Sequence, residues 1–108
     1  MKVVISGANS AVGQAILRCA SEQRAGPNTF VAAVRSERAA DTIQPLLGKG
    51  RSAVRISYDD PSSLDAAFEG TSAVIHLAGI LVERAGSTYE QANVATTRSI
   101  VEIGRAHV

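Results

Sequence analysis

The chain has 108 residues, of which 45% are hydrophobic, and carries a formal net charge of +1. This length suits one small domain with a substantial core, and the near-neutral charge argues against a nucleic-acid or anionic-membrane surface. Cys19 is the single cysteine, which excludes an internal disulfide and indicates a reducing compartment. No apolar run approaches the ~20 residues of a membrane span, and no signal-peptide pattern opens the chain. We therefore expect a soluble, cytoplasmic protein.

Short apolar runs alternate with helical patterns along the chain. The apolar runs predict strands at residues 2–6, 29–34, 53–57 and 73–78. Each run is continuously apolar rather than alternating, which is typical of parallel strands that are covered on both faces. Helices are predicted over residues 11–23, over 37–47 with an interruption near Pro45, from 61 to about 70, and from 87 almost to the end.

Local signals mark the ends of these helices. Asp60 suits an N-cap, Pro61 the first helical position, and Gly70 the C-terminal end. The stretch "STYE" is a capping box, in which Ser87 caps the helix and Glu90 reaches back. Helical spacing predicts apolar faces that include Val12, Ala15, Ile16, Cys19 and Ala20 in the first helix, and Tyr89, Ala92, Thr96, Ile100 and Ile103 in the last.

The predicted order is β-α-β-α-β-α-β-α. This alternation is typical of the α/β class: a Rossmann-type doubly wound parallel sheet, with right-handed crossovers and helices on both faces. Numbered along the chain, the four strands are expected in the order 3-2-1-4, within one domain over residues 1–108. A cofactor would bind at the carboxyl ends of the first and fourth strands, where the winding reverses.

The turn after the first strand is the first candidate site. Gly7 and Gly13 fit two of the three glycine roles in a phosphate-binding turn, the tight bend and the close packing of helix on strand. The middle position holds Ser10, and Ala8 stands where the Gly-x-Gly-x-x-Gly spacing has its second glycine. Two glycines after a strand also fit an ordinary strand-to-helix turn. A cofactor site is favoured because helix N-termini attract phosphate, and because Asn9 and Ser10 can donate hydrogen bonds to it.

The end of the second strand predicts which dinucleotide binds. An NAD site generally has an acidic residue about 20 positions after the glycine turn, and this residue bonds the ribose hydroxyls. Here the position holds Arg35, and the first carboxylate after it is Glu37. Because a guanidinium pairs with phosphate through a planar fork of donors, Arg35 favours NADP over NAD. The alternative is that Arg35 and Arg38 are solvated surface residues.

Several stretches, in matching order, resemble one family. "ISGANSAVG" is similar to the Thr-Gly-x-x-Gly-x-x-Gly turn of extended and atypical short-chain dehydrogenases/reductases. "YDDPSSLDAAFEGTSAVIHLAG" resembles the family's passage from the third strand to the fourth, and "YEQANVATTRSIVEIGRAHV" resembles its next helix. "HLAGILVERAGSTYEQANV" is also similar to the atypical branch that contains the NADPH-binding accessory subunit of respiratory complex I. The resemblance covers nearly all 108 residues and implies an NAD(P)-binding domain.

The resemblance also implies a set of cofactor-binding residues. By position, the pyrophosphate would face Gly7, Asn9, Ser10, Ala11, Val12 and Gly13. Arg35 would meet the adenosine 2′-phosphate. Since Ser57 holds the place of the family's adenine-binding aspartate, its neighbours Tyr58 and Asp59 are the expected substitutes. The middle of the cofactor would be lined by Leu77, Ala78 and Gly79, with Ile80 and Leu81 toward the nicotinamide.

The resemblance supplies no catalytic residue within this sequence. The family's catalytic serine and its Tyr-x-x-x-Lys pair follow later in the chain, so we expect the N-terminal portion of a longer protein. Tyr58 and Tyr89 are followed four residues later by Ser62 and Asn93 rather than by lysine. The resemblance implies a structural role for His76, and it matches Asn93 to an asparagine that organises a proton-relay water.

Two functions stay open. The first is the NAD(P)-binding domain of an oxidoreductase, epimerase or dehydratase, with NADP favoured and the catalytic residues elsewhere in the parent protein. The second is a non-catalytic NADPH-binding structural or sensory module, as the likeness to the complex I subunit implies. The fourth strand would lie at an edge of the sheet without a charge to discourage pairing, apart from one on His76. We therefore also expect self-association through this strand or the last helix.

Overall fold

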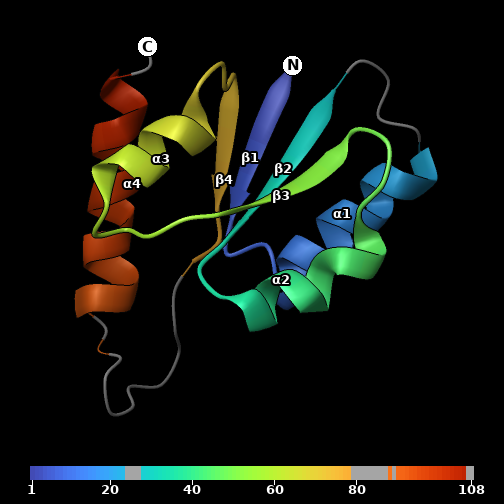
Figure 1. Ribbon diagram of the computed structural model, residues 1–108, viewed down its shortest axis with the longest axis horizontal. Helices are drawn as coiled ribbons and strands as arrows, with labels where there is room; N and C mark the ends of the chain where they lie inside the picture. Colours follow the sequence, from blue (N-terminus) through green and yellow to red (C-terminus); the bar gives the residue numbers. More distant parts are fainter. Residues whose placement is uncertain (24–27, 79–87, 89, 107–108) are drawn as a thin grey trace.

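The structure is a computed structural model that describes residues 1–23, 28–78, 88 and 90–106. Its centre is a four-stranded parallel sheet in the order β3-β2-β1-β4 (Figure 1). The strands are β1 (Lys2–Ser6), β2 (Thr29–Val34), β3 (Arg51–Arg55) and β4 (Ala73–His76). The helices are α1 (Ala11–Gln23), α2 (Glu37–Ile43), α3 (Pro61–Phe68) and α4 (Thr96–Ala106), with a 3₁₀ turn at Gln44–Leu46 and a π-helical turn at Glu90–Ala95. The predicted fold class and strand order are confirmed.

Helices cover both faces of the sheet, as a doubly wound fold requires (Figure 1). One core lies beneath α1 and α2 and includes Ile5, Leu17, Ala32, Val34 and Ile43. The other lies beneath α3 and α4 and includes Val4, Ala33, Leu64, Phe68, Ile100 and Ile103. Successive residues of a strand point to opposite faces, so Val4 and Ile5 belong to different cores and both are fully buried. Burial on both faces is the reason that the central strands are continuously apolar.

Two strand boundaries differ from the prediction, whereas β1, β2 and α1 span the predicted residues. β3 lies two residues earlier than 53–57, because its pairing with β2 begins at Arg51, opposite Phe30. Main-chain pairing at a sheet edge does not require apolar side chains, so the apolar pattern placed this strand too late. β4 ends at His76 rather than at residue 78, although the Leu77 N–H still donates to the Ser6 carbonyl at 3.0 Å.

The buried face of α1 also differs from the prediction. Cys19 is exposed, and Val12 is 58% exposed, whereas Leu17 is fully buried. The reason is Gly13: a Cβ atom there would lie 2.4 Å from the Ala8 carbonyl oxygen, so α1 approaches the preceding turn at this residue. Leu17, four residues later, points the same way, and this sets the rotation of the helix.

Most of the predicted helix ends are confirmed. The Asp60 carboxylate accepts a hydrogen bond from the Ser62 N–H at 3.1 Å, with Pro61 in the first turn of α3. The second helix changes to a 3₁₀ turn at Gln44–Leu46, around Pro45. Thr96, Ile100 and Ile103 of α4 are buried as predicted, while Ser87 of the capping box lies outside the described residues.

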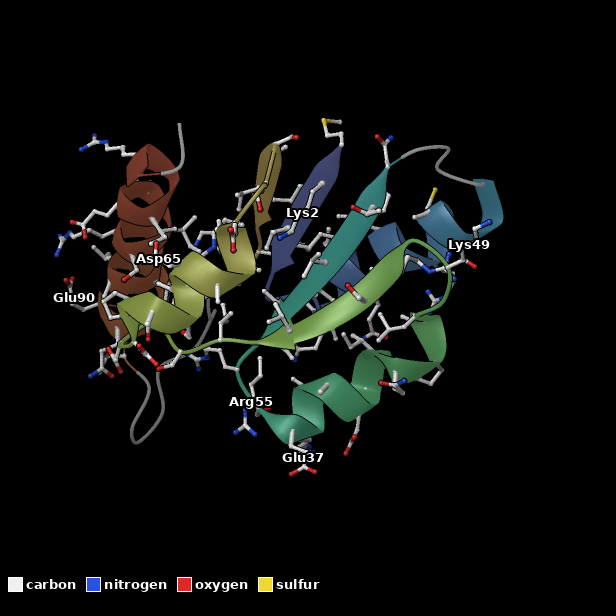
Figure 2. All side chains as sticks on the ribbon, turned by 45° about the horizontal axis from the view of Figure 1, so that its top comes forward. Lys2, Glu37, Lys49, Arg55, Asp65 and Glu90 are labelled. Carbon is white, nitrogen blue, oxygen red and sulfur yellow. The ribbon has the colours of Figure 1, made fainter. Side chains whose placement is uncertain are left out.

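Lys2, at the start of β1, contacts the end of α3. Its ammonium donates to the carbonyls of Ala67 at 3.1 Å and Glu69 at 2.6 Å. In Figure 2 the Lys2 side chain extends from β1 toward α3. A positive charge at this position stabilises the negative end of the helix dipole. Of the helices in the described part of the chain, none has the length and apolar character of a membrane span.

Candidate functional site

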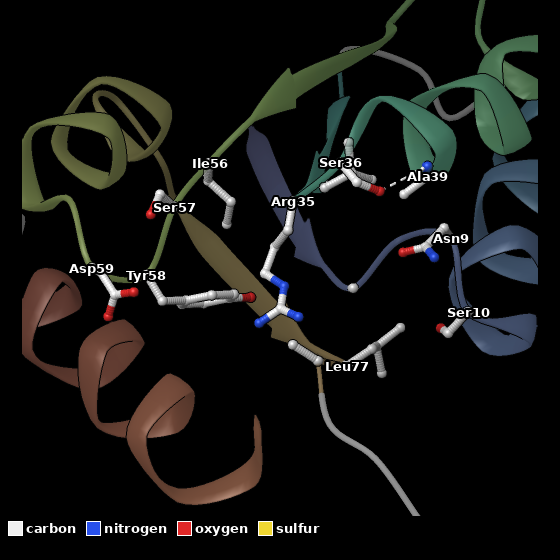
Figure 3. Close-up of a pocket in the computed structure, with 13 residues that line it drawn as sticks. Asn9, Ser10, Arg35, Ser36, Ala39, Ile56, Ser57, Tyr58, Asp59 and Leu77 are labelled. Carbon is white, nitrogen blue, oxygen red and sulfur yellow. Dashed lines mark hydrogen bonds between the residues drawn. The ribbon is translucent and has the colours of Figure 1, made fainter. Parts of the chain in front are cut away.

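A pocket opens at the carboxyl ends of the strands. It has a volume of about 570 Å³ and is called the strand-end pocket below. Its walls are the turn after β1, the residues that follow β2 and β3, and the end of β4 (Figure 3). The lining residues are Gly7, Asn9, Ser10, Val34, Arg35, Ser36, Ala39, Ile56, Ser57, Tyr58, Asp59, Leu77 and Ala78. This is the place where open parallel sheets bind ligands.

The glycine turn is packed tightly against β4. Gly7 has a φ of +63°, and a Cβ atom there would lie 2.6 Å from the backbone nitrogen of Ala78. The tight bend and the close backbone approach therefore both require glycine at this residue. Gly13 allows close packing of α1 on the turn at Ala8, whereas the sequence predicted close packing of the helix on the strand.

Ser10 forms the N-cap of α1. Its Oγ accepts a hydrogen bond from the Gly13 N–H at 3.1 Å, and its carbonyl accepts from the Gln14 N–H at 2.9 Å. Because Oγ is the acceptor here, the hydroxyl hydrogen is left to donate to a second group, such as a phosphate oxygen. The serine at the middle position thus supports the helix and keeps a donor beside the pocket.

The side chains of Arg35 and Tyr58 lie next to each other in the wall of the strand-end pocket. Arg35 follows β2 and is exposed, and its Cζ atom lies 5.8 Å from the centroid of the Tyr58 ring (Figure 3). The Tyr58 hydroxyl is buried and has no hydrogen-bond partner among the described residues. Burial raises the pKa of Tyr58 above its ordinary value, and the nearby Arg35 charge offsets this in part. The phenol is therefore neutral at physiological pH.

The structure gathers eight of the twelve predicted cofactor-binding residues around this pocket. These are Gly7, Asn9, Ser10, Arg35, Tyr58, Asp59, Leu77 and Ala78. Ala11, Val12 and Gly13 lie in the first turn of α1 and do not line it, and Gly79 lies outside the described residues.

The prediction of site residues omitted five lining residues. These are Val34, Ser36, Ala39, Ile56 and Ser57. The rule that ligands bind at the carboxyl ends of parallel strands indicates Val34, Ser36, Ile56 and Ser57, since they surround the ends of the second and third strands. Ala39 is brought near by the N-cap of α2, where its N–H donates to Ser36 Oγ at 3.1 Å.

A directed chain of hydrogen bonds runs beneath the pocket from β1 to α4. The Thr97 hydroxyl donates to the Asn93 carbonyl at 2.6 Å, so its oxygen accepts from His76 Nε2–H at 3.1 Å. His76 Nδ1 therefore carries no hydrogen and accepts from the Ser6 hydroxyl at 2.5 Å. Ser6 Oγ in turn accepts from the Leu77 N–H at 3.2 Å, and this N–H is shared with the Ser6 carbonyl. His76 thus joins β1, β4 and α4 in its neutral form.

We expect the free energy of unfolding to fall as the pH is lowered from 7.5 to 5.5. Burial lowers the pKa of His76 below its ordinary value of 6.5, so the unfolded chain takes up a proton first. The contribution of neutral His76 to the free energy of unfolding is fully present above pH 6.5. It is lost as the pH falls through the lowered pKa that His76 has in the folded protein. Urea denaturation at several pH values measures it. His76→Gln should make the free energy of unfolding less dependent on pH between 7.5 and 5.5. If the variant keeps the pH dependence of the wild-type protein, His76 is not its source.

The described ranges contain no group of three or more His, Cys, Asp or Glu side chains suited to a metal ion. The site instead offers backbone N–H groups, hydroxyls and one guanidinium, which are donors to anions.

No protein-family model matches the chain, and a comparison with curated proteins finds no match. Solved structures do share its fold. Uronate dehydrogenase from Agrobacterium tumefaciens is 21% identical with a TM-score of 0.71, over 98% of this chain and 36% of that enzyme. UDP-glucuronic acid 4-epimerase from Bacillus cereus is 19% identical with a TM-score of 0.79, over 100% of this chain and 37% of that enzyme. A short-chain dehydrogenase/reductase from Vibrio parahaemolyticus is 17% identical with a TM-score of 0.77, over 98% of this chain and 52% of that protein.

At these identities the likeness establishes a shared fold. The chain therefore shares its Rossmann-type fold with a part of each of these three proteins. It spans little more than a third of the first two enzymes and about half of the third.

Proposed function

We propose that this chain is the dinucleotide-binding domain of a short-chain dehydrogenase/reductase-like oxidoreductase, epimerase or dehydratase. The observation that carries the proposal is the strand-end pocket, where the glycine turn, Arg35 and Tyr58 meet at the carboxyl ends of parallel strands. Uronate dehydrogenase and the epimerase, which share the fold, were each solved with NAD. This supports a nicotinamide dinucleotide as the ligand, which supplies hydride transfer when bound.

The donors of the pocket fit such a ligand. In the proposed complex the pyrophosphate lies at the glycine turn, where the Ser10 hydroxyl keeps a hydrogen to donate. Ala11 and Val12 would contribute the N–H groups at the start of α1. The adenosine half lies toward Arg35, Tyr58 and Asp59, and the middle of the cofactor lies along Leu77, Ala78 and Gly79.

We propose that the domain prefers NADP(H) to NAD(H), although the two solved enzymes carry NAD. Arg35 is an exposed guanidinium on the pocket wall, at the position where an NAD site generally has a carboxylate. Glu37, the first acidic residue after it, is not a lining residue. A guanidinium attracts a 2′-phosphate and offers no acceptor for ribose hydroxyls.

Arg35→Ala should weaken NADPH binding roughly 10- to 100-fold, the range expected for a lost charge-assisted hydrogen bond. NADH affinity should change by less than about twofold on the same reasoning, because the contact is to the extra phosphate. Calorimetric titration with each dinucleotide measures both.

Arg38→Ala is the matched control for this titration. It removes the same charge three residues later, from a side chain that is exposed and does not line the pocket. NADPH affinity should change little in this variant. Equal affinity of the wild-type protein for NADPH and NADH, or an Arg35→Ala variant that keeps NADPH affinity, would refute the preference.

A non-catalytic NADPH-binding module is the second candidate. It rests on the resemblance of "HLAGILVERAGSTYEQANV" to the branch that contains the NADPH-binding accessory subunit of respiratory complex I. A Tyr-x-x-x-Lys in a longer parent sequence would support the enzyme, and its absence there would support the module.

We propose that the protein self-associates through the edge of the sheet at β4. β4 is an edge strand of the described sheet, and its stretch Ala73–His76 has no permanently charged side chain, so a second chain could pair with this edge. We also propose a cytoplasmic location, on the basis of the single cysteine.

A further inference from the structure

We propose that Tyr58 positions Arg35 for the 2′-phosphate and is thereby a specificity-determining residue that acts through Arg35. The inference rests on the proposed function and assigns Tyr58 a role different from the adenine contact that the sequence resemblance implies. The two side chains come from neighbouring strands, since Arg35 follows β2 and Tyr58 comes three residues after the end of β3. With Cζ at 5.8 Å from the ring centroid, the guanidinium is within range of a cation–π contact (Figure 3).

Tyr58 is held in place without any ligand. Its side chain packs against the core beneath α3 and α4, and the His76 ring meets it edge-on, with centroids 6.4 Å apart and planes inclined at 71°. Its carbonyl faces the Ser99 hydroxyl of α4 at 3.5 Å. Through His76, the ring also adjoins the hydrogen-bond chain that joins β1, β4 and α4. The ring is therefore a fixed surface in the pocket wall.

Arg35, in contrast, is exposed and has a long side chain with several rotatable bonds. Ordering such a side chain on binding costs conformational entropy, and a contact that limits its freedom beforehand reduces this cost. The neutral phenol offers a ring face without a negative charge, so it orients the guanidinium without neutralising it. The buried hydroxyl has no hydrogen-bond partner in the described part of the chain, so we assign the positioning of Arg35 to the ring.

The ring and the hydroxyl can be separated by mutation. Tyr58→Phe keeps the ring face, whereas Tyr58→Met removes it and keeps an apolar side chain. Tyr58→Met should weaken NADPH binding about two- to fivefold more than it weakens NADH binding, a difference that corresponds to a cation–π contact at a partly exposed site. Tyr58→Phe should keep the wild-type ratio of the two affinities. In an Arg35→Ala background, Tyr58→Met should no longer change that ratio.

The readout is the ratio of the dissociation constants for NADPH and NADH, measured by calorimetry on variants whose circular dichroism matches that of the wild-type protein. A purely structural role, or a contact with adenine, would weaken both dinucleotides equally, and that result would overturn the inference while leaving the proposed function intact. A Tyr58→Phe variant whose ratio of the two dissociation constants differs from that of the wild-type protein would overturn the inference as well. If the wild-type protein binds neither dinucleotide, the proposed function itself fails. Should Tyr58→Met not fold, Tyr58→Leu provides the same comparison.

Discussion

Gly7→Ala should destabilise the protein by about 3 kcal/mol or more and abolish dinucleotide binding. Left-handed backbone costs a residue with a Cβ atom about 1–2 kcal/mol, and forcing an extra carbon into a packed site adds typically 1–3 kcal/mol. Both costs apply at Gly7, where φ is +63° and the added Cβ would lie 2.6 Å from Ala78 N and 2.8 Å from Leu77 C. These are backbone atoms, so relief requires that the turn or the end of β4 move.

Gly70→Ala is the matched control for this experiment. Gly70 also has positive φ, at +71°, but an added Cβ there meets nothing within 4 Å. It should cost only the backbone part, about 1–2 kcal/mol. The difference between the two free energies of unfolding, obtained from urea denaturation, then isolates the contact of the turn with β4. Equal losses in the two variants would contradict the close packing described here.

Gly13→Ala should destabilise the protein by about 1–3 kcal/mol, although the same change in a helix normally stabilises by about 1 kcal/mol. The reversal of sign arises because the new Cβ would lie 2.4 Å from the Ala8 carbonyl oxygen. Gly104→Ala in α4 is the control, since a Cβ there meets nothing within 4 Å. It should show the ordinary stabilisation of up to about 1 kcal/mol. Urea denaturation that gives the same sign for both variants would refute the argument.

The fold was predictable from the sequence because its central elements obey local rules. β1 and β2 are buried on both faces, and such strands are continuously apolar, so their bounds could be predicted to the residue. β3 is an edge strand held by main-chain pairing, and its residues Ser52 and Ala53 are exposed. The apolar pattern alone therefore predicted this strand two residues too late. Cys19 was misplaced for a different reason. The rotation of α1 is set by the contact of Gly13 with Ala8, which helical spacing does not contain.

The candidate site was predictable where it follows from the ends of strands. The glycine turn, Arg35 and Tyr58 all come within a few residues of a strand end, and the topology then brings them together. The contact between Arg35 and Tyr58 was not predictable, because it depends on the directions of two side chains from strands that pair only in the folded sheet. The same holds for His76, whose partners Ser6 and Thr97 are 70 and 21 residues away along the chain.

The central place of β1 in the sheet has a consequence for synthesis on the ribosome. Both of its neighbours, β2 and β4, are made after it, and the pair Ser6 and His76 is separated by 70 residues. At translation rates of about 5–20 residues per second, the second of these neighbours follows β1 by roughly 4–14 s. During this interval the apolar strand Val3–Ile5 has an unpaired edge on the side that β4 will occupy. The nascent chain is therefore a candidate for chaperone binding until β4 has left the exit tunnel, and the pairing of β4 with β1 closes the largest loop of the described sheet.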